Sequence, residues 1–310
     1  MEFILVSLLN GIVYGLLLFM VSAGLTLIFG MMGILNMAHA SFYMIGAYAG
    51  YVASRYSFAL GLIVAPLLTA TIGVLMERYL LRPIHKYGHG HQLMFTFGFA
   101  FVIEEIVKLL FGDFPVRYTA PPELTFTAFE IFGTHFPFYR LFIALVAIAI
   151  FAAIYLLLTR TRVGIVVRAA ESLPVMTSAL GHDVSLVFGG VFAAGAAVAG
   201  LAGAVGGAYY PTSPTMALEF GVIVFVVVVG GLGSVVGSLW ASLLIGVLTS
   251  FAIGADISLY SIAAKLGFGQ WVADLGAFTK TSLSLFAGSV PFVLMLFVLL
   301  FRPMGLMGRR

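Results

Sequence analysis

Long apolar runs almost free of charge recur along the whole chain, and they constrain its fold more than any other feature. Nine such segments occur within its 310 residues, at 4–29, 33–54, 58–77, 92–111, 141–158, 186–208, 218–232, 234–254 and 284–301. About 20 apolar residues suffice for a helix to cross the hydrocarbon core of a bilayer. The sequence therefore predicts an all-α polytopic membrane protein with about eight or nine transmembrane helices, forming a single transmembrane domain over residues 1–310.

Composition excludes several classes of function. Hydrophobic residues make up 62% of the chain and charged residues only 9%, which leaves little material for a soluble domain. The net charge of +3 is too small for a nucleic-acid surface, so no nucleic-acid partner is expected. The absence of cysteine excludes thiolate metal sites and cysteine nucleophiles. We find no motif of an enzyme active site and expect no metal or cofactor in this chain.

Two pairs of apolar segments are separated only by glycine-containing breaks. Gly30-Met31-Met32-Gly33 joins the first pair, and Gly233 joins 218–232 to 234–254. Irregular backbone at membrane depth is tolerated only where protein or a water-filled cavity covers it. Each pair is therefore interpreted as a broken or re-entrant helix beside a pathway. The second and seventh segments lie an odd number of spans apart, which permits inverted repeats of the kind that transporters use.

The distribution of basic residues favours an N-terminus outside and a C-terminus inside. Inner loops would hold nine basic residues and outer loops five, and cytoplasmic loops carry the excess of Lys and Arg. The inner set is Arg78, Arg82, Lys86, Arg160, Arg162, Arg168, Arg302, Arg309 and Arg310. The outer set is Arg55, Arg117, Arg140, Lys265 and Lys280.

An amide and an imidazole interrupt the second apolar segment. Asn36 and His39 are three residues apart, which places them on one face of a helix, and Ser41 follows. Polar groups in hydrocarbon need partners. They either hydrogen-bond a broken helix to its neighbour or line a polar pathway for a substrate.

The second glycine break has its own polar signature, made of Gly230, Gly231, Gly233 and Ser234. It superficially resembles a phosphate-binding loop but lacks the Gly-Lys-Ser/Thr sequence and the preceding strand. We interpret it as a helix break that faces Asn36 and His39 across a narrow pathway. A Gly231→Leu change is then expected to block transport more than it harms membrane insertion.

Other polar or glycine-rich stretches favour structural interpretations. Glycines at 189–207 predict a closely packed helix. Glu104, Glu105 and Lys108 predict an i,i+4 ion pair near the outer interface, with an ion-coupling carboxylate as the alternative. His85, His89 and His91 have a spacing that a metal could use, but no cysteine or carboxylate accompanies them, and an ordinary inner loop is favoured.

The longest loops differ in character. Residues 112–139, rich in proline and aromatic residues, predict an ordered outer cap. Residues 159–185 combine a basic flank with Glu171 and a terminating Gly181, as is typical of a short amphipathic cytoplasmic helix. Between 255 and 283, Tyr260 and Trp271 indicate a segment at the membrane interface.

An ordered set of motifs resembles branched-chain amino acid ABC transporter permeases of the LivH type, a family of hydrophobic amino acid uptake. The set includes Gly24 to Gly30, Leu35 to Ala40, Met44 to Tyr48, Glu77-Arg78 with Arg82-Pro83, Arg168-Ala169 through Gly181, Gly230 to Ser234, and Phe301 to Leu306. The resemblance implies an importer in the bacterial inner membrane. It would contain a second, homologous permease subunit, two cytoplasmic ATPase subunits that bind ATP, and a periplasmic substrate-binding protein.

The resemblance also implies that 164–183 is the cytoplasmic segment that couples the permease to an ATPase, with Arg168, Glu171 and Gly181 as its marked positions. The chain itself lacks a Walker A motif, so ATP must be hydrolysed on partner subunits. Ten positions separate Glu171 from Gly181, unlike the EAA-x3-G pattern of better-known importers.

Three classes of function stay open on the sequence. The first is the importer permease, with branched-chain amino acids as leading substrates and urea, short amides or aromatic acids as alternatives. The second is a secondary transporter driven through Glu104 and Glu105, and the third is a structural membrane subunit. No Lys or Arg occurs between Arg168 and Lys265. A transported carboxylate would then rely on helix N-termini, the partner subunit or hydroxyls such as Ser22, Thr26 and Ser234.

Overall fold

A computed structural model of the chain describes residues 2–33, 36–131, 133–231, 233–255, 258, 260, 263, 264, 281–302 and 305–307. Most of the expected interfacial segment at 255–283, including Trp271, lies outside the described residues. The basic residues Lys265, Lys280, Arg309 and Arg310 lie outside them as well.

The helices coincide in position with the nine apolar segments. They are α1 (Glu2–Met32), α2 (His39–Ser54), α3 (Phe58–Leu75), α5 (His89–Phe111), α6 (Phe138–Arg160), α9 (Val184–Gly206), α10 (Met216–Gly231), α11 (Val235–Gly254) and α14 (Val290–Phe301). In the part of the chain that the structure describes, six helical stretches are long and apolar enough to cross a membrane. With 16 residues each, α2 and α10 reach only about 24 Å, short of the roughly 30 Å hydrocarbon core. Both adjoin a predicted break.

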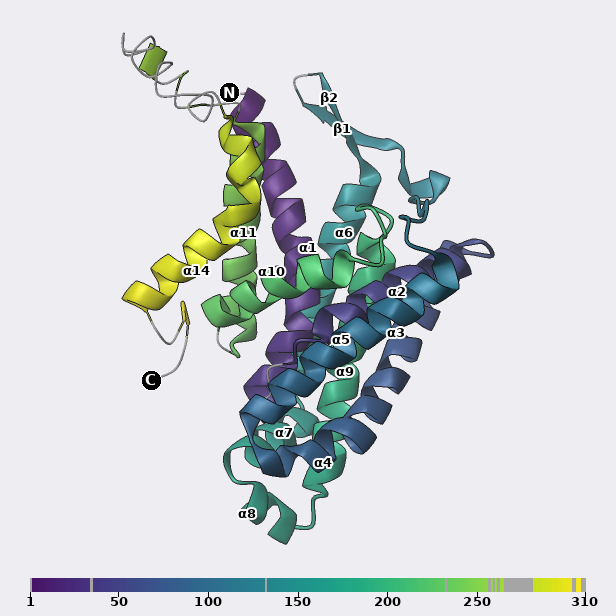
Figure 1. Ribbon diagram of the computed structural model, residues 1–310, viewed down its shortest axis with the longest axis vertical. Coiled ribbons are helices and arrows are strands. Elements are labelled where there is room, and N and C mark those ends of the chain that lie inside the picture. The colour runs from purple at the N-terminus through teal and green to yellow at the C-terminus, as the bar shows by residue number, and fades with distance from the viewer. Residues whose placement is uncertain are drawn as a thin grey trace.

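Shorter elements connect these helices at the two ends of the molecule (Figure 1). One end holds η1 (Met76–Leu81), α4 (Arg82–Ile84), η2 (His85–Tyr87), α7 (Arg162–Ser172) and α8 (Pro174–Ala179). At the other end, η3 (Pro122–Leu124) precedes an antiparallel hairpin of β1 (Thr127–Ile131) and β2 (Thr134–Pro137). The 3-10 turn η5 (Leu283–Ser289) leads into α14. Among the described residues, the hairpin forms the one sheet of an otherwise helical fold.

The outer cap predicted at 112–139 is tied to the helices beneath it. Val116 pairs with Thr212 in an isolated bridge. The Tyr118 hydroxyl donates to the Ala204 carbonyl at 2.7 Å. Burial raises the pKa of the Tyr118 phenol, which keeps this hydroxyl protonated as a donor.

Helix α1 is the centre of the fold, packed against α6, α9, α10 and α11. Small residues let the backbones approach, as Gly15 shows, where a Cβ would lie 2.7 Å from the Ser242 carbonyl oxygen. The glycines of α9 act in the same way, because Gly195 packs on the backbone of α1 and Gly203 on that of α2. The interpretation of 189–207 as a closely packed helix is confirmed.

The two ends of the molecule separate the predicted inner and outer loops. Arg82, Arg162 and Arg168 lie on elements at the α4, α7 and α8 end. Arg117 and Arg140 lie toward the hairpin, at the end that also carries the chain's N-terminus (Figure 1). These five residues therefore lie at two different ends, as the charge pattern groups them.

Candidate functional site

The break between α1 and α2 forms a buried polar corner. Helix α1 ends where Gly33 adopts a left-handed conformation with φ of +63°, and its N–H donates to the Phe29 carbonyl at 2.9 Å. Asn36 lies in the following turn, where its Oδ1 accepts the Ala38 N–H at 3.0 Å. His39 is the first residue of α2. The prediction that Asn36 and His39 share a helical face is wrong, because Asn36 precedes the helix and supports the turn.

Asn36 and His39 nevertheless reach the same small cavity between α1, α2 and α10. Leu25, Met37 and Ala40 complete its near side, and Gly221 and Val224 of α10 form its far side. The cavity measures about 10 Å³, which is near the lower limit for one water molecule. In this structure the corner is closed to any substrate.

Four buried polar side-chain atoms on this part of α1 and α2 have no hydrogen-bond partner among the described residues. Asn36 Nδ2 and His39 Nδ1 belong to residues that line the cavity, and Thr26 Oγ1 and Ser41 Oγ belong to residues that follow the lining residues Leu25 and Ala40 in the chain. Each of the four residues is at most 2% exposed. Leaving such a group buried without a partner costs about 1–3 kcal/mol. A cluster of them therefore requires an explanation beyond packing.

The His39 ring has one defined contact, which fixes its proton. Its Nε2 lies 3.2 Å from the Val21 carbonyl oxygen, which can only accept a hydrogen bond. A neutral ring therefore carries its proton on Nε2 and leaves Nδ1 as a free acceptor. The corner thus offers an acceptor at His39 Nδ1 and donors at Asn36 Nδ2.

The glycine break between α10 and α11 does not face this corner. Gly233, with φ of +77°, packs against Gly30 at the end of α1. Gly221, at the cavity, is ten residues before Gly231, or about 15 Å along α10. The expected facing of Asn36 and His39 by the 230–234 break is wrong, because it is the first half of α10 that meets them.

The residues of this second break have structural contacts of their own. A Cβ on Gly231 would lie 2.5 Å from the Ser238 backbone nitrogen, and one on Gly230 would lie 3.2 Å from Ala241 Cβ. Ser234 caps α11 by accepting the Gly237 N–H at 3.2 Å. These positions form a tight turn between two helices.

The stretch 159–185, in which one short amphipathic helix was expected, contains two helices, α7 and α8, and the predicted coupling segment 164–183 covers most of both. Thr161 caps α7 by accepting the Gly164 N–H, and the Arg168 guanidinium donates to the Leu158 carbonyl at the end of α6. Pro174 starts α8 because a proline is tolerated in the first helical turn. Glu171 lies near the end of α7, and Gly181, with φ of +89°, follows α8.

Helix α8 lies at the tip of the molecule (Figure 1). The exposed large apolar side chains on α8 and at its two caps are Leu173, Val175, Met176 and Leu180. Val175 and Leu180 are 79% and 81% exposed, respectively. An apolar patch beside arginines at the polar end of a membrane protein is typical of a protein-docking surface.

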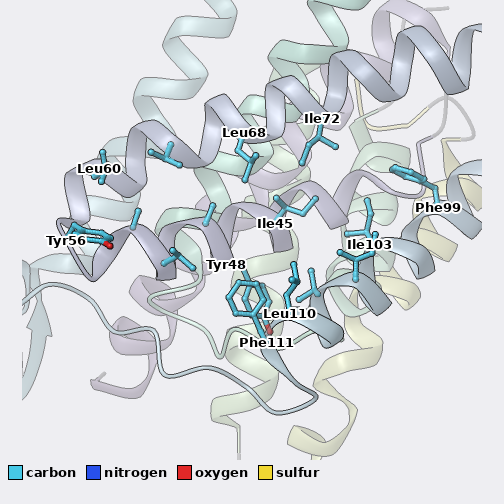
Figure 2. A pocket seen from close by; sticks show the side chains of 16 residues that line it. Ile45, Tyr48, Tyr56, Leu60, Leu68, Ile72, Phe99, Ile103, Leu110 and Phe111 are labelled. Atoms are coloured by element: carbon cyan, nitrogen blue, oxygen red, sulfur yellow. The ribbon is translucent and has the colours of Figure 1, made fainter.

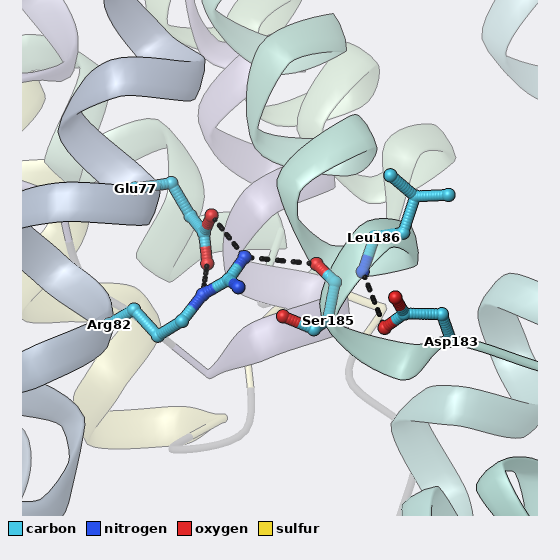
Figure 3. A network of polar contacts seen from close by, with 5 residues as sticks. All are labelled: Glu77, Arg82, Asp183, Ser185 and Leu186. Carbon is cyan, nitrogen blue, oxygen red and sulfur yellow. Dashed lines mark hydrogen bonds and ion pairs between the residues drawn. The ribbon is translucent and has the colours of Figure 1, made fainter.

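A salt bridge between η1 and α4, which the sequence did not indicate as a site, is tied to the start of α9 (Figure 3). The Arg82 guanidinium donates two hydrogen bonds to the buried Glu77 carboxylate, at 3.1 and 2.8 Å, and a third to the Ser185 carbonyl at 3.2 Å. Asp183 caps α9 by accepting the Leu186 N–H at 3.1 Å. Glu77 and Arg82 are five residues apart, a spacing that meets on a π-helix and not on an α-helix, and η1 is a π-helix. The five-residue spacing of Glu77 and Arg82 is the sequence feature from which this salt bridge could have been predicted.

The remaining ionisable residues agree with structural roles. Lys108 Nζ lies 2.8 Å from carboxylate oxygens of both Glu104 and Glu105, which confirms the predicted ion pair and extends it. His85 Nδ1 lies 3.0 Å from the Gln92 amide. Over the described residues, no group of three or more His, Cys, Asp or Glu could hold a metal ion.

Comparisons with known proteins point to one family. Residues 7–299 match the family model described as the permease component of branched-chain amino acid transport systems. BraD of Pseudomonas aeruginosa is 27% identical over 98% of this chain and 95% of its own. LivH of Salmonella typhimurium and LivH of Escherichia coli are 26% and 24% identical, each over 97% of this chain and 94% of its own. All three are named high-affinity branched-chain amino acid transport system permease proteins. No solved structure matches the chain.

Proposed function

Because this chain belongs to the family of permease components of branched-chain amino acid transport systems, we propose that it is one permease subunit of an ABC importer for branched-chain or related hydrophobic amino acids. The observation that carries this proposal is the family match over almost the whole chain. The names of the relatives support it, and so does the buried, uncharged polar corner at the centre of the fold.

The proposed location is the bacterial inner membrane, with the N-terminus in the periplasm and the C-terminus in the cytoplasm. The excess of basic residues in the loops grouped with α4, α7 and α8 favours that end as cytoplasmic. The hairpin end then faces the periplasm.

The proposed partners are a second homologous permease, two cytoplasmic ATPases and a periplasmic substrate-binding protein. The sequence has no Walker A motif and almost no material for a soluble domain. ATP would therefore act as a cofactor of the partner subunits, while this chain needs none. Transport then depends on a mechanical connection from the ATPases to the membrane helices.

The α7–α8 segment is the proposed connection. Its exposed apolar side chains and Arg168, Glu171 and Gly181 would seat the segment on an ATPase. Helix α9 follows α8, and Arg82 ties the start of α9 to α4, which continues from α3 through η1. A displacement of α8 would therefore move α9 and α3 together, biasing the helices between two states.

The proposed pathway runs through the corner lined by Asn36 and His39, with Thr26 and Ser41 next to its lining residues in the chain. Their unpartnered polar atoms would hydrogen-bond the passing substrate once the corner opens. Opening would require α10 to move away from α1 and α2, and the turn at Gly230, Gly231, Gly233 and Ser234 would serve as its pivot. The structure would then correspond to a closed state.

The chemistry of the corner favours a small zwitterion with an apolar side chain. No charged residue lines the cavity, whose apolar members include Leu25, Met37 and Val224. The positive end of the α2 helix dipole lies beside it, because α2 begins at His39, and it would attract a carboxylate. Selection among amino acids would rest mainly on the binding protein.

Uptake measurements test the proposal. The four-component complex would be reconstituted in proteoliposomes with ATP inside, and uptake of leucine, urea and an aromatic acid would be compared. Leucine uptake that depends on ATP and on the binding protein is expected. Uptake of only urea or the aromatic acid would overturn the leading substrate. Gradient-driven uptake by this chain alone would indicate a secondary transporter.

A second test addresses the coupling segment. The charge reversals Arg168→Glu and Glu171→Lys in one protein are expected to release the ATPases and abolish uptake. Arg160→Glu, just outside the segment, is the matched control and should retain most uptake. If the double variant kept the ATPases bound and uptake intact, the coupling role would be wrong.

A further inference from the structure

Helices α2, α3 and α5 form an open apolar groove on the surface of the fold (Figure 2). One wall runs along α3 from Leu60 to Ile72, the other along α5 from Phe99 to Phe111, and Ile45 and Tyr48 of α2 form part of the floor. The groove measures about 650 Å³, a size typical of small-molecule sites. None of its lining residues is charged.

The length of the groove matches one leaflet of a membrane. Each wall spans twelve residue steps, from 60 to 72 and from 99 to 111, or about 18 Å of helix. Half of the hydrocarbon core is about 15 Å thick. A membrane-crossing helix of a partner subunit would need an apolar groove about 30 Å long, nearly twice this length. An acyl chain fits the dimension better.

A polar pocket adjoins one end of the groove. Tyr56 lines both, and the second pocket, of about 580 Å³, also contains Arg117 and Glu123 from the loop before the hairpin. Within the described residues, neither Arg117 nor Glu123 has a hydrogen bond or an ion pair. A tyrosine between apolar and polar surfaces is typical of the membrane interface.

We propose that the groove and the polar pocket together bind one glycerophospholipid with a primary ammonium in its headgroup. An acyl chain lies between α3 and α5, the phosphate pairs with Arg117, and the ammonium pairs with Glu123. The pocket offers one cation, Arg117, and one carboxylate, Glu123, and this pair favours a headgroup with a primary ammonium. Glu123 would repel an anionic headgroup. A quaternary ammonium headgroup could not donate a hydrogen bond to Glu123. The lipid belongs to the leaflet on the hairpin side.

This inference requires only that the chain is embedded in a membrane. It does not depend on the transported substrate or on the ATPases. Its failure and the failure of the proposed import function are therefore separate outcomes.

Native mass spectrometry of the full-length protein tests it. The protein would be reconstituted in vesicles of equal parts phosphatidylethanolamine, phosphatidylglycerol and phosphatidylcholine, extracted in mild detergent, and its retained lipid identified. Retention of phosphatidylethanolamine in preference to the other two is expected. Val64→Trp, which fills the groove, should lower retention at least fivefold. Leu67→Trp, on a 63% exposed position of α3 outside the groove, is the matched control and should change it less than twofold.

The headgroup variants give an independent readout that does not alter the helix packing. Arg117→Gln should lower retention of all three lipids, and Glu123→Gln should remove the preference for phosphatidylethanolamine over phosphatidylglycerol. Equal retention of the three lipids by the unmodified protein would overturn the proposal, as would unchanged retention in Val64→Trp. If Val64→Trp instead released a copurifying second permease while lipid stayed bound, the groove would be a subunit interface.

Discussion

The two glycine breaks look alike in sequence but differ in how their polar groups are satisfied. Gly33 after α1 and Gly233 after α10 both adopt left-handed conformations, and each is followed closely by another helix. In the α10–α11 turn, Ser234 caps α11, and the Gly230 carbonyl accepts the Leu306 N–H at 2.6 Å. In the α1–α2 corner, polar atoms of Asn36 and His39 are buried without partners.

The difference between the two breaks indicates which of them has a structural role and which is a candidate for transport. The paired Ser234 hydroxyl and Gly230 carbonyl of the α10–α11 turn stabilise the fold as it stands. A corner that leaves several polar groups unpaired loses stability in this closed state and regains it only when something else supplies the hydrogen bonds. The α1–α2 corner therefore fits a substrate pathway, whereas the α10–α11 turn fits a pivot.

The largest expected effect is that of Gly231→Leu on folding. A Cβ there would lie 2.5 Å from the Ser238 nitrogen, so a leucine forces α10 and α11 apart. We expect the yield of monodisperse protein in detergent to fall at least tenfold, in line with the 1–3 kcal/mol or more that overpacking costs. Gly98→Leu, at an exposed α5 position with open space around it, is the control and should be tolerated. The sequence alone predicted that Gly231→Leu would block transport more than it harms membrane insertion, and the structure predicts a folding defect instead. A normal yield of protein that does not transport would indicate that the 230–234 break lines the pathway after all.

The double variant Thr26→Val with Ser41→Ala is expected to have the opposite effect, a loss of transport without a loss of stability. It removes two buried hydroxyls without partners, so the melting temperature should hold or rise. Leucine uptake should fall about tenfold, since these hydroxyls would contact the substrate.

Ser22→Ala is its matched control on the same helix. The Ser22 hydroxyl lies 2.9 Å from that of Ser238, so losing it should destabilise the protein by about 1 kcal/mol with uptake per folded molecule unchanged. If the double variant transported normally, the orphan groups of the corner would have no role in transport.

A smaller effect is expected for Gly221→Ala, which narrows the cavity from the side of α10. Its Cβ would lie 3.6 Å from Ala40 Cβ, an ordinary contact, so the protein should fold and gain some helix stability. Uptake should fall about threefold, because the added methyl group would project from α10 into the cavity and narrow the proposed pathway. Unchanged uptake would place the pathway elsewhere, and Gly98→Ala controls for the general effect of the substitution.

The smallest effect is expected for Ser234→Ala in the satisfied turn. Loss of the cap on α11 should cost about 1 kcal/mol and lower the melting temperature by a few degrees. Uptake at temperatures well below melting should not change. A large loss of uptake in a stable protein would contradict the division between corner and turn.

Much of the fold could be predicted from local sequence, because hydropathy and spacing act within a single helix. The nine apolar segments, the Glu104–Lys108 ion pair and the packing helix at 189–207 are of this kind. The site could be predicted only in part. Asn36 and His39 were identified as polar interruptions, but Gly221 and Val224 come from a helix about 180 residues away that carries no polar signal. The π-helix at Met76–Leu81 was not predicted, and the five-residue spacing of Glu77 and Arg82 was its one sequence signal.

The central position of α1 has a consequence for how the protein is made. Ser22 meets Ser238, which is 216 residues later in the chain. At 5–20 residues synthesised per second, α1 waits roughly 10–40 s in the bilayer before α11 exists. During that interval its glycine face is open to lipid and to other nascent helices. A chain truncated before α11 should therefore be recognised as incomplete and degraded, and its stability should return when the C-terminal part is supplied as a separate fragment.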